Sequence, residues 1–419
     1  MLDLKEKILV SFPSLLIALI PLFLISGPFL SDLSIVLVSI FFFINIILNK
    51  NFNYFNNTFF KIFLIFFFYL VLNSIIKYYD INNIRSSVSY LRFGIFSLAV
   101  IYYLDKKPIL LKWLFYVFVF CFVLLTLDGF IQYFFKENLI GNPVDQESYR
   151  IMFLFNDEYI LGSFLSRMYP IFLGITFYLY RDKKNFIILI SLLFILIETL
   201  IFLSGERVAF FFNTLAALFI IIMIKDFKKI RVATLTLSFA VIVLISFHDN
   251  SAKYRIWDQT ITQLGIKSEK INLFSETHES HYNSAYKMFL DNKLIGIGIR
   301  NFRNFCNNQK YKIDKHSCTT HPHNTYVQFL SETGIIGISF ALILLFYYVF
   351  KMLNHLKGAL FKKKYLFNDY EICMLAAILI TIWPFAPSGN FFNNWLSIVY
   401  YYPVGFFLWS FKNKSLKSS

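Results

Sequence analysis

The chain has 419 residues, of which 57% are hydrophobic, 20% are aromatic and only 16% are charged. This composition excludes an ordinary soluble protein, and the aliphatic and aromatic content excludes a disordered chain. The net charge of +15 alone fits a nucleic-acid partner, an anionic substrate or a membrane surface. Four cysteines are too few for a disulfide scaffold, and the hydrophobicity makes a membrane protein the first class to consider.

Apolar stretches of membrane-spanning length follow one another along the chain. A helix that crosses the hydrocarbon core, roughly 30 Å thick, needs about 20 apolar residues because it rises about 1.5 Å per residue. Twelve such stretches predict an all-α polytopic membrane protein with about 12 transmembrane helices. The first has no small-residue cleavage signature, so we expect a membrane helix there and not a signal peptide. Spans one and two, seven and eight, and eleven and twelve are joined tightly enough to predict hairpins. The expected spans are 8–30, 31–48, 58–76, 87–104, 109–134, 161–180, 185–204, 206–225, 231–248, 325–350, 370–388 and 391–411.

Short loops rich in Lys and Arg alternate with poorer loops, which predicts the orientation. Because such loops stay on the cytoplasmic side, we expect both termini in the cytoplasm and residues 249–324 outside. The chain then divides into helices one to nine (1–248), a large periplasmic loop with short helices (249–324), and helices ten to twelve with a cytoplasmic tail (325–419). The positive charge is explained as an orientation signal, so we expect no nucleic-acid partner. The basic loop residues are Lys106, Lys107, Lys112, Arg181, Lys183, Lys184, Lys225, Lys228, Lys229, Arg231, Lys351, Lys357, Lys362, Lys363, Lys364, Lys412, Lys414 and Lys417.

Six of the seven histidines lie between residues 248 and 323, in the large loop or directly before it, and the loop also contains two of the four cysteines. In an oxidising compartment Cys306 and Cys318 can close a disulfide, and the alternative is two free thiols. A zinc site from His316, Cys318, His321 and His323 fits by residue type, but the spacing matches no tight ligand pattern, so we expect no metal. The six histidines are His248, His278, His281, His316, His321 and His323.

Two helical pieces are expected inside this loop. Residues 280–290 have the pattern of a short amphipathic helix lying on the membrane face. Gly296 and Gly298 predict a turn, and the basic run 300–303 begins a second helical piece.

Five charged residues lie inside the predicted spans, where a charge is costly and is a functional candidate by default. With the orientation above, all five fall in the outer half of the membrane, which predicts a polar cavity that opens outward. The alternative is that each is a snorkelling end charge or one half of an ion pair between helices. The five are Arg92, Asp128, Arg167, Glu198 and Glu332.

The starts of two spans suit an anionic ligand. Arginine offers a fork of donors to phosphate, and a helix N-terminus adds unpaired N–H groups. The small residues 204–205 turn the chain and place Arg207 in the first turn of the eighth span. Pro322 fixes the approach to the tenth span and Asn324 caps it, which leaves His323 at the cavity mouth as a candidate general base. The alternative for His323 is plain capping or interfacial anchoring.

Four strings in this part of the chain resemble one family. His323 and Asn324, followed after nine residues by Gly334-Ile335-Ile336-Gly337, match the histidine-asparagine plus G-x-x-G signature of the O-antigen ligase and O-antigen polymerase family. The resemblance runs from about residue 150 to residue 337, and the first 130 residues agree only in hydrophobicity. The strings are FNDEYILGSFLSRMYP, FLSGERVAFF, MFLDNKLIGIGIRNFR, in which Lys293 stands for a common proline, and HPHNTYVQFLSETGIIG.

The resemblance implies transfer of a glycan from an undecaprenyl-pyrophosphate carrier to an acceptor hydroxyl on the outer face of the bacterial inner membrane. The acceptor is the lipid A core in the ligases and another lipid-linked repeat unit in the polymerases. Such enzymes are expected to use no nucleotide sugar, no cofactor and no metal. The implied partners are therefore the lipid-linked donor, a lipid A-core or lipid-linked glycan acceptor, and membrane lipids.

Residue roles follow from this reaction. Arg207 would bind the pyrophosphate and stabilise the charge that grows on the leaving group. His323 would orient or deprotonate the attacking hydroxyl, which gives inversion at the anomeric carbon. Arg167, Arg150 or a loop arginine would complete the phosphate clamp. The expected supporting residues are Asn324, His321, Glu206 and Glu332, and the alternative for the two carboxylates is simple pairing with arginines.

The family pattern also includes a second functional arginine in the large loop. Ahead of the string MFLDN, where many relatives carry it, this chain has His278 and His281. The remaining candidates are Arg255, Arg300 and Arg303, of which we favour the last two because they follow the glycine turn.

Two other classes of function fit less well. A flippase or transporter for a lipid-linked sugar would show charges through both leaflets or inverted repeats, and neither is evident. A structural partner of a cell-wall machine gives no reason for the histidine signature beside a phosphate-suited arginine. The peptidoglycan polymerases that act in cell shape and cell division are structurally similar enzymes, but they are expected to rely on an aspartate at the outer face and not on a histidine. Ligase and polymerase share the strings above, so the sequence leaves that choice open.

Overall fold

The computed structural model is built from helices. It describes residues 6–77, 80–144, 150–151, 155, 159–248, 253–263 and 274–418, and these ranges contain no strand. Most elements are α-helices, and three short ones are π or 3-10 helices, marked η. In chain order they are η1 Lys7–Ser11, α2 Phe12–Ser26, α3 Pro28–Asn49, η2 Phe52–Phe55, α4 Thr58–Ile76, α5 Ile81–Ser89, α6 Leu91–Lys106, α7 Leu110–Phe135, α8 Leu161–Leu179, α9 Lys184–Leu203, α10 Arg207–Met223, α11 Lys228–His248, η4 Tyr254–Asp258, α13 Gln259–Gln263, α14 Glu276–Asp291, α15 Phe302–Phe305, α16 Thr325–Lys362, α17 Asp369–Ile382 and α18 Asn394–Ser418.

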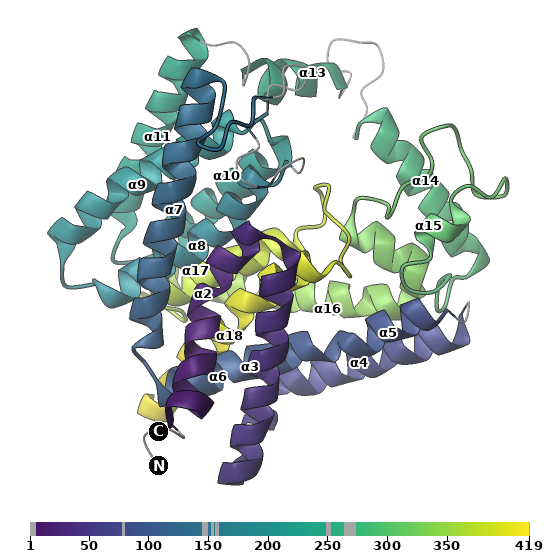
Figure 1. The fold of residues 1–419 in the computed structure, drawn as a ribbon, viewed down its shortest axis with the longest axis horizontal. Coiled ribbons are helices and arrows are strands. Elements are labelled where there is room, and N and C mark those ends of the chain that lie inside the picture. Colours follow the sequence, from purple (N-terminus) through teal and green to yellow (C-terminus); the bar gives the residue numbers. More distant parts are fainter. Residues whose placement is uncertain are drawn as a thin grey trace.

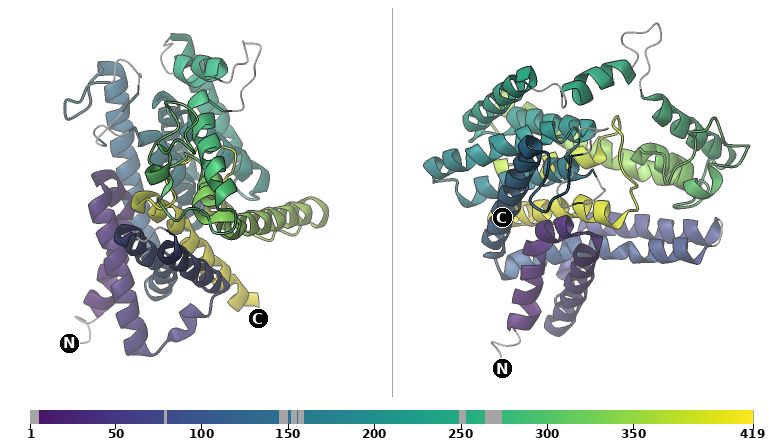
Figure 2. Two further views of the ribbon diagram at one scale, coloured as in Figure 1. Left: turned by 90° about the vertical axis from the view of Figure 1, so that its right-hand side faces the viewer. Right: turned by 45° about the horizontal axis from the view of Figure 1, so that its top comes forward.

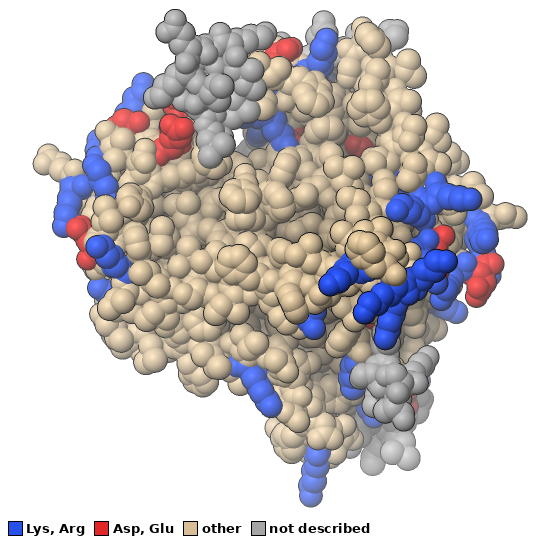
Figure 3. Space-filling model, turned by 180° about the vertical axis from the view of Figure 1, so that it is seen from behind, with Lys and Arg blue, Asp and Glu red and all other residues tan. Residues whose placement is uncertain are grey.

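Each of the twelve expected spans coincides with a helix. Within the described residues, eight helical stretches are long and apolar enough to cross a membrane, and α10 is a shorter apolar helix. The three other expected spans fall on α8, α17 and α18. One face of the molecule is a broad uncharged field with Lys and Arg gathered mainly towards its margins (Figure 3). The chain is therefore an all-helical polytopic membrane protein, as the sequence predicts. The eight stretches are Lys7–Ser26, Pro28–Asn49, Thr58–Ile76, Ile81–Lys106, Leu110–Phe135, Lys184–Leu203, Lys228–Phe247 and Thr325–Lys362.

The helices pack both with chain neighbours and across long sequence distances. The three predicted hairpins form, with α2 on α3, α9 on α10 and α17 on α18. At the centre α17 packs on α8 and α18 packs on α6, and the residues there, such as Met374 and Tyr402, are fully buried. The two marked chain ends lie at the lower end of the molecule in Figure 1, and α13 lies at the opposite end. The described parts of the large loop are thus held away from the termini.

Helix α16 is broken where a loop segment crosses it. At Gly334 a φ of 63° and a ψ of −164° interrupt the helix. The segment 293–298 crosses this break and pairs with its backbone, for example through Ile297 N–H, which donates to Ser331 O at 2.9 Å. A Cβ atom on Gly334 or on Gly296 would collide with the backbone of the opposite segment. The first glycine of the G-x-x-G signature is therefore needed for a close backbone crossing.

The described parts of the large loop form a small helical layer on α16. α14 contains the expected amphipathic helix 280–290 and packs on α16 (Figures 1 and 2). Gly296 and Gly298 both have positive φ, and α15 supplies the second helical piece. The Sγ atoms of Cys306 and Cys318 are joined as a disulfide, with Cα atoms 4.9 Å apart. Buried apolar side chains from α14 and α15 give this layer a core of its own.

Candidate functional site

The turn between α9 and α10 presents Arg207 to the large loop. Gly205 has a φ of 69°, which glycine adopts without strain, and α10 begins at Arg207. Arg207 Nη1 donates to Gln263 Oε1 at 2.7 Å, and Arg255 Nε donates to Gly205 O at 3.4 Å. The segment 253–263 therefore lies against this turn and brings the loop arginine Arg255 to it.

Two further arginines and one carboxylate gather beside Arg207. The Glu206 carboxylate accepts from two backbone N–H groups in the first turn of α8, at 2.6 and 3.0 Å. Arg167 donates to a serine hydroxyl in the same turn at 2.6 Å, and it stacks over an aromatic ring of α10. The charge of Arg150 acts on both Glu206 and Arg207. Three of the five predicted phosphate-binding arginines, Arg150, Arg167 and Arg207, are thus brought together around one carboxylate.

Four histidines, which we call the histidine cluster, surround the turn 319–324. The ring centroid of His323 lies 4.2 Å from that of His321, 5.3 Å from that of His281 and 5.7 Å from that of His278. His278 and His281 share one face of α14 because they are three residues apart. Among the other loop histidines, His316 is exposed and the side chain of His248 lies outside the described residues.

The segment 383–393, between α17 and α18, supports this turn. Asn324 Oδ1 accepts from two backbone N–H groups in the first turn of α16, at 2.9 and 3.1 Å, which confirms the predicted cap. The side-chain amide of Asn324 donates to carbonyls of the 383–393 segment, and Ser388 N–H donates to His323 O at 2.9 Å. His323 itself has a φ of 54°, an unfavourable conformation for a residue with a Cβ. The surrounding hydrogen bonds hold it there.

Burial keeps the cluster uncharged near neutral pH. Desolvation, followed by the effects of His321, His281 and His278, lowers the pKa of His323 to about 3. Desolvation also lowers the pKa of His321 to about 4. The pKa of His278 is lowered by burial, by His281 and by the positive charge of Arg207. The positive charge of Arg207 therefore acts on His278, one member of the histidine cluster.

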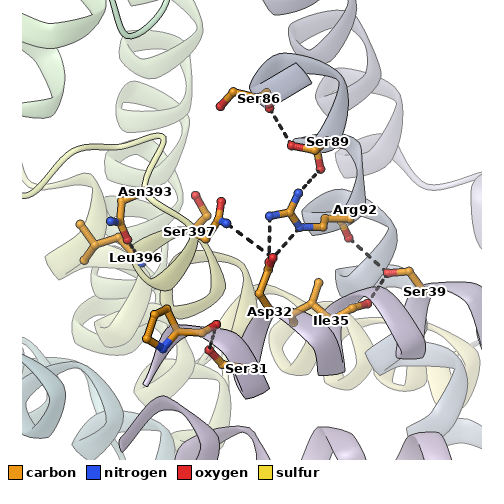
Figure 4. A network of polar contacts seen from close by, with 12 residues as sticks. Ser31, Asp32, Ile35, Ser39, Ser86, Ser89, Arg92, Asn393, Leu396 and Ser397 are labelled. Carbon is orange, nitrogen blue, oxygen red and sulfur yellow. Dashed lines mark hydrogen bonds and ion pairs between the residues drawn. The ribbon is translucent and has the colours of Figure 1, made fainter. Parts of the chain in front are cut away.

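Three of the five charges expected to line an outward cavity instead have structural partners. Arg92 makes an ion pair with Asp32 at 2.8 Å, and both side chains belong to a polar network between α3, α6 and the start of α18 (Figure 4). Asp128 accepts from Leu139 N at 2.7 Å and is buried. The expectation of one shared cavity is wrong for these two and for Glu198.

Glu198 is paired inside the helix bundle. Its carboxylate contacts the guanidinium of Arg231, and each side chain is 1% exposed. Arg231 was expected among the basic residues of a cytoplasmic loop, at the start of the ninth span, but it lies in the first turn of α11 and is buried against α9. The basic run at residues 228–231 therefore does more than indicate the orientation of the chain, because its last residue, Arg231, neutralises a buried carboxylate.

The remaining candidates lie around the crossing in α16. Arg300 Nη1 donates to Ser86 Oγ at 3.1 Å, and the charge of Arg303 acts on His321. Glu332 is fully buried, and its carboxylate accepts from Phe302 N at 3.1 Å and from a glutamine amide at 3.0 Å. Glu206 and Glu332 thus both accept hydrogen bonds from amide N–H groups. Simple pairing with arginines was the alternative expected for them from the sequence.

The disulfide removes Cys318 from the set of residues considered for zinc. Within the described residues, no group of three or more His, Cys, Asp or Glu side chains is arranged to hold a metal ion. The thiols of Cys121 and Cys373 are buried in the helix bundle and far along the chain from the loop.

The fold and the site together define a polytopic membrane protein that has an arginine at the start of α10 and a buried cluster of histidines around His323. Residues 190–342 match the family model described as O-antigen ligase, so this stretch of the chain is similar to that family. The match contains the arginine turn, the large loop and the crossing in α16, and it confirms the resemblance carried by three of the four strings. The fourth string, at 155–170, precedes the matched range and lies partly outside the described residues. A comparison with curated proteins gives no match.

Proposed function

We propose that the protein transfers a glycan from an undecaprenyl-pyrophosphate carrier to an acceptor hydroxyl, at the periplasmic face of the bacterial inner membrane. The proposal is carried by the histidine cluster around His323, whose member His278 lies 5.7 Å from it between ring centroids and is acted on by the positive charge of Arg207. The family of residues 190–342 supports a surface-glycan ligase or polymerase. The orientation rests on the basic short loops, and both termini are placed in the cytoplasm, opposite the large loop.

Arg207 is the anchor for the pyrophosphate. It begins α10, where unpaired N–H groups and the helix dipole favour an anion. Its described partner is the neutral amide of Gln263, which a phosphate oxygen can replace without breaking an ion pair. As the bond to the sugar breaks, negative charge grows on the leaving pyrophosphate, and a fixed guanidinium stabilises that charge. Arg150, Arg167 and Arg255 add positive potential around it.

His323 activates the acceptor. A neutral imidazole takes the proton of the attacking hydroxyl, whose oxygen forms the new bond to the anomeric carbon while the pyrophosphate leaves from the opposite face. Direct displacement of this kind inverts the anomeric configuration, and the chain needs no covalent glycan intermediate. Asn324, Ser388 and His321 hold the turn so that the imidazole stays in place.

Two single variants test the assignment. We expect His323→Ala and Arg207→Ala to lower glycan transfer by at least about 100-fold, because each removes a group that acts on the transition state. Transfer is measured with membranes that carry equal amounts of protein, with lipid-linked glycan as donor. Exposed residues away from the site, changed as Lys312→Ala and Arg181→Ala, are the controls. Normal product from either site variant refutes the catalytic role.

A gene deletion separates the two acceptor classes. Loss of all polymer attached to the lipid A core on a gel indicates a ligase. A single attached repeat unit indicates a polymerase that uses a second lipid-linked unit as acceptor.

A further inference from the structure

Glu206 stands at the N-cap of one helix but caps another. It directly precedes Arg207, the first residue of α10, and among the described residues its side chain makes no capping hydrogen bond to that helix. Its two carboxylate oxygens instead accept from Gly162 N at 2.6 Å and from Ser163 N at 3.0 Å. These are the second and third N–H groups of α8, the pair that an N-cap side chain satisfies. The cap of α8 is thus supplied by the residue before α10.

The start of α8 depends on this cap from outside. Its own N-cap residue is Ile160, whose side chain has no polar atom. Glu206 is 8% exposed, so its carboxylate has little access to water. A negative charge at a helix N-terminus is also favoured by the helix dipole. The contact therefore satisfies both sides, since N–H groups without a partner in their own helix meet a buried carboxylate.

The residues around the contact allow a close approach. A Cβ atom on Gly162 would lie 2.5 Å from Ser204 Oγ and 3.2 Å from Glu206 Oε1. Any side chain at position 162 would therefore push the turn 204–206 away from α8. Ser204 Oγ also accepts from Glu206 N at 3.3 Å, which holds the backbone from which the carboxylate comes. The glycine and the serine together let the carboxylate reach α8.

The cap also sets the positions of two arginines. Arg207 is the next residue after Glu206, so the contact with α8 fixes the start of α10 from which Arg207 extends. Ser163, which donates its N–H to Glu206, accepts from Arg167 Nη1 at 2.6 Å through its hydroxyl. Both arginines are thus held by the same turn of α8. Because Glu206 is turned towards α8, the first N–H groups of α10 have no side-chain cap among the described residues, and an anion can bind them.

We propose that Glu206 is a positioning residue for glycan transfer, which by capping α8 holds Arg207 in place and keeps its own carboxylate away from the start of α10. This inference rests on the proposed function, in which the pyrophosphate binds at that start. Glu206 acts through Arg207 and does not touch the substrate. With both carboxylate oxygens bonded to α8, it does not compete with a phosphate oxygen for the N–H groups of α10.

The sharpest test is Glu206→Asp, which keeps the charge and shortens the side chain by one methylene group. Aspartate is among the best N-cap residues, so we expect the shorter carboxylate to leave α8 and to cap α10, where it repels the pyrophosphate. The kcat/KM for the lipid-linked donor should fall by about 10–100-fold, because a small displacement of a binding group has effects of this size. The Tm should stay near that of the wild type, since one cap replaces another. Transfer and thermal unfolding are measured on one preparation.

Two further variants separate positioning from capping alone. Asn368→Ala is the matched control, because it removes the capping box of α17, in which Asn368 Oδ1 accepts from Glu371 N at 2.8 Å. We expect it to lower the Tm and to leave transfer unchanged. Gly162→Ala keeps Glu206 but displaces the turn 204–206, and it should lower transfer as Glu206→Asp does.

A double-mutant cycle tests whether Glu206 acts through Arg207. In an Arg207→Ala protein, Glu206→Asp should lower transfer little further, because the group that it positions is already absent. An equally large effect of Glu206→Asp in both backgrounds overturns the inference, since it means that Glu206 acts independently of Arg207. A Glu206→Asp protein with the kcat/KM of the wild type overturns it as well.

Amide hydrogen exchange separates this inference from the proposed function. If the wild type transfers no glycan, the proposed function fails, and exchange of the protein in lipid nanodiscs still tests the positioning. In Glu206→Ala we expect faster exchange at the start of α8 and also in the segment 253–263, which Arg207 holds through Gln263 Oε1 at 2.7 Å. Asn368→Ala should change neither region. Faster exchange at α8 with an unchanged segment 253–263 indicates a local cap only and refutes the positioning role.

Discussion

Arg231 and Arg207 both stand in the first turn of a helix, and their partners are opposite in kind. Arg231 is fully buried, pairs with Glu198 and donates to Thr234 Oγ1 at 3.1 Å. Arg207 is partly buried and donates to the neutral amide of Gln263, with the like charge of Arg150 nearby. Among the described residues, the first arginine is neutralised by the protein and the second is not. The difference separates a guanidinium that stabilises the fold from one to which we assign an anionic ligand.

The largest expected effect falls on the neutralised arginine. Arg231→Met leaves Glu198 buried without its cation, which costs about 3–5 kcal/mol in the free energy of unfolding. The measurement is thermal or denaturant unfolding in a fixed detergent, with tryptophan fluorescence as the signal. In Arg231→Met combined with Glu198→Leu most of this loss should return, because both charges are then absent. An equally unstable double variant would mean that the pair contributes more than charge neutralisation.

The opposite pattern is expected at Arg207. Arg207→Gln should lower transfer by about 10²–10³-fold, since one positioned donor at a developing charge contributes on this scale. The Tm of the same variant should stay near that of the wild type. The side chain of Gln263 is only partly buried, so it can form a hydrogen bond to water or to the amide of the new glutamine. Unfolding and transfer are measured on one preparation. A Tm loss as large as that of Arg231→Met would erase the distinction between the two arginines.

Arg92 provides the smallest effect and an intermediate case. It has a carboxylate partner, Asp32, but the two side chains are 14% and 30% exposed. Solvent screening limits such a pair to about 0–1 kcal/mol, so Arg92→Ala should change the free energy of unfolding by less than about 1 kcal/mol and leave transfer intact. A loss of several kcal/mol would show that a carboxylate partner matters more than burial.

The parts of this structure that depend on local sequence were predictable. Runs of apolar residues locate the spans, Asn324 caps α16, and Gly205 turns the chain so that α10 begins at Arg207. Each of these features is determined within a few residues. The same holds for Gly334, although the sequence indicates only that a glycine is needed and not which segment crosses there.

Contacts between distant residues were not predictable from spacing. Arg231 follows a run of lysines, so the positive-inside pattern assigns it to solvent, and only the packing of α11 on α9 brings Glu198 to it. The packing of α14 on α16 likewise brings His278 and His281 to His323. The clue in the sequence was the gathering of histidines in one loop, which gives their number but not their partners.

The crossing of segment 293–298 over the break in α16 also decides where the large loop can change in length. Its backbone hydrogen bonds fix the register on both sides of Gly334, and neither Gly296 nor Gly334 has space for a side chain. An inserted residue there would pull the start of α16, and with it His323, out of line with α14. Insertions among the exposed residues 307–310, inside the disulfide-closed turn, break no such register. The loop can therefore change in length there while His323 keeps its place against α14.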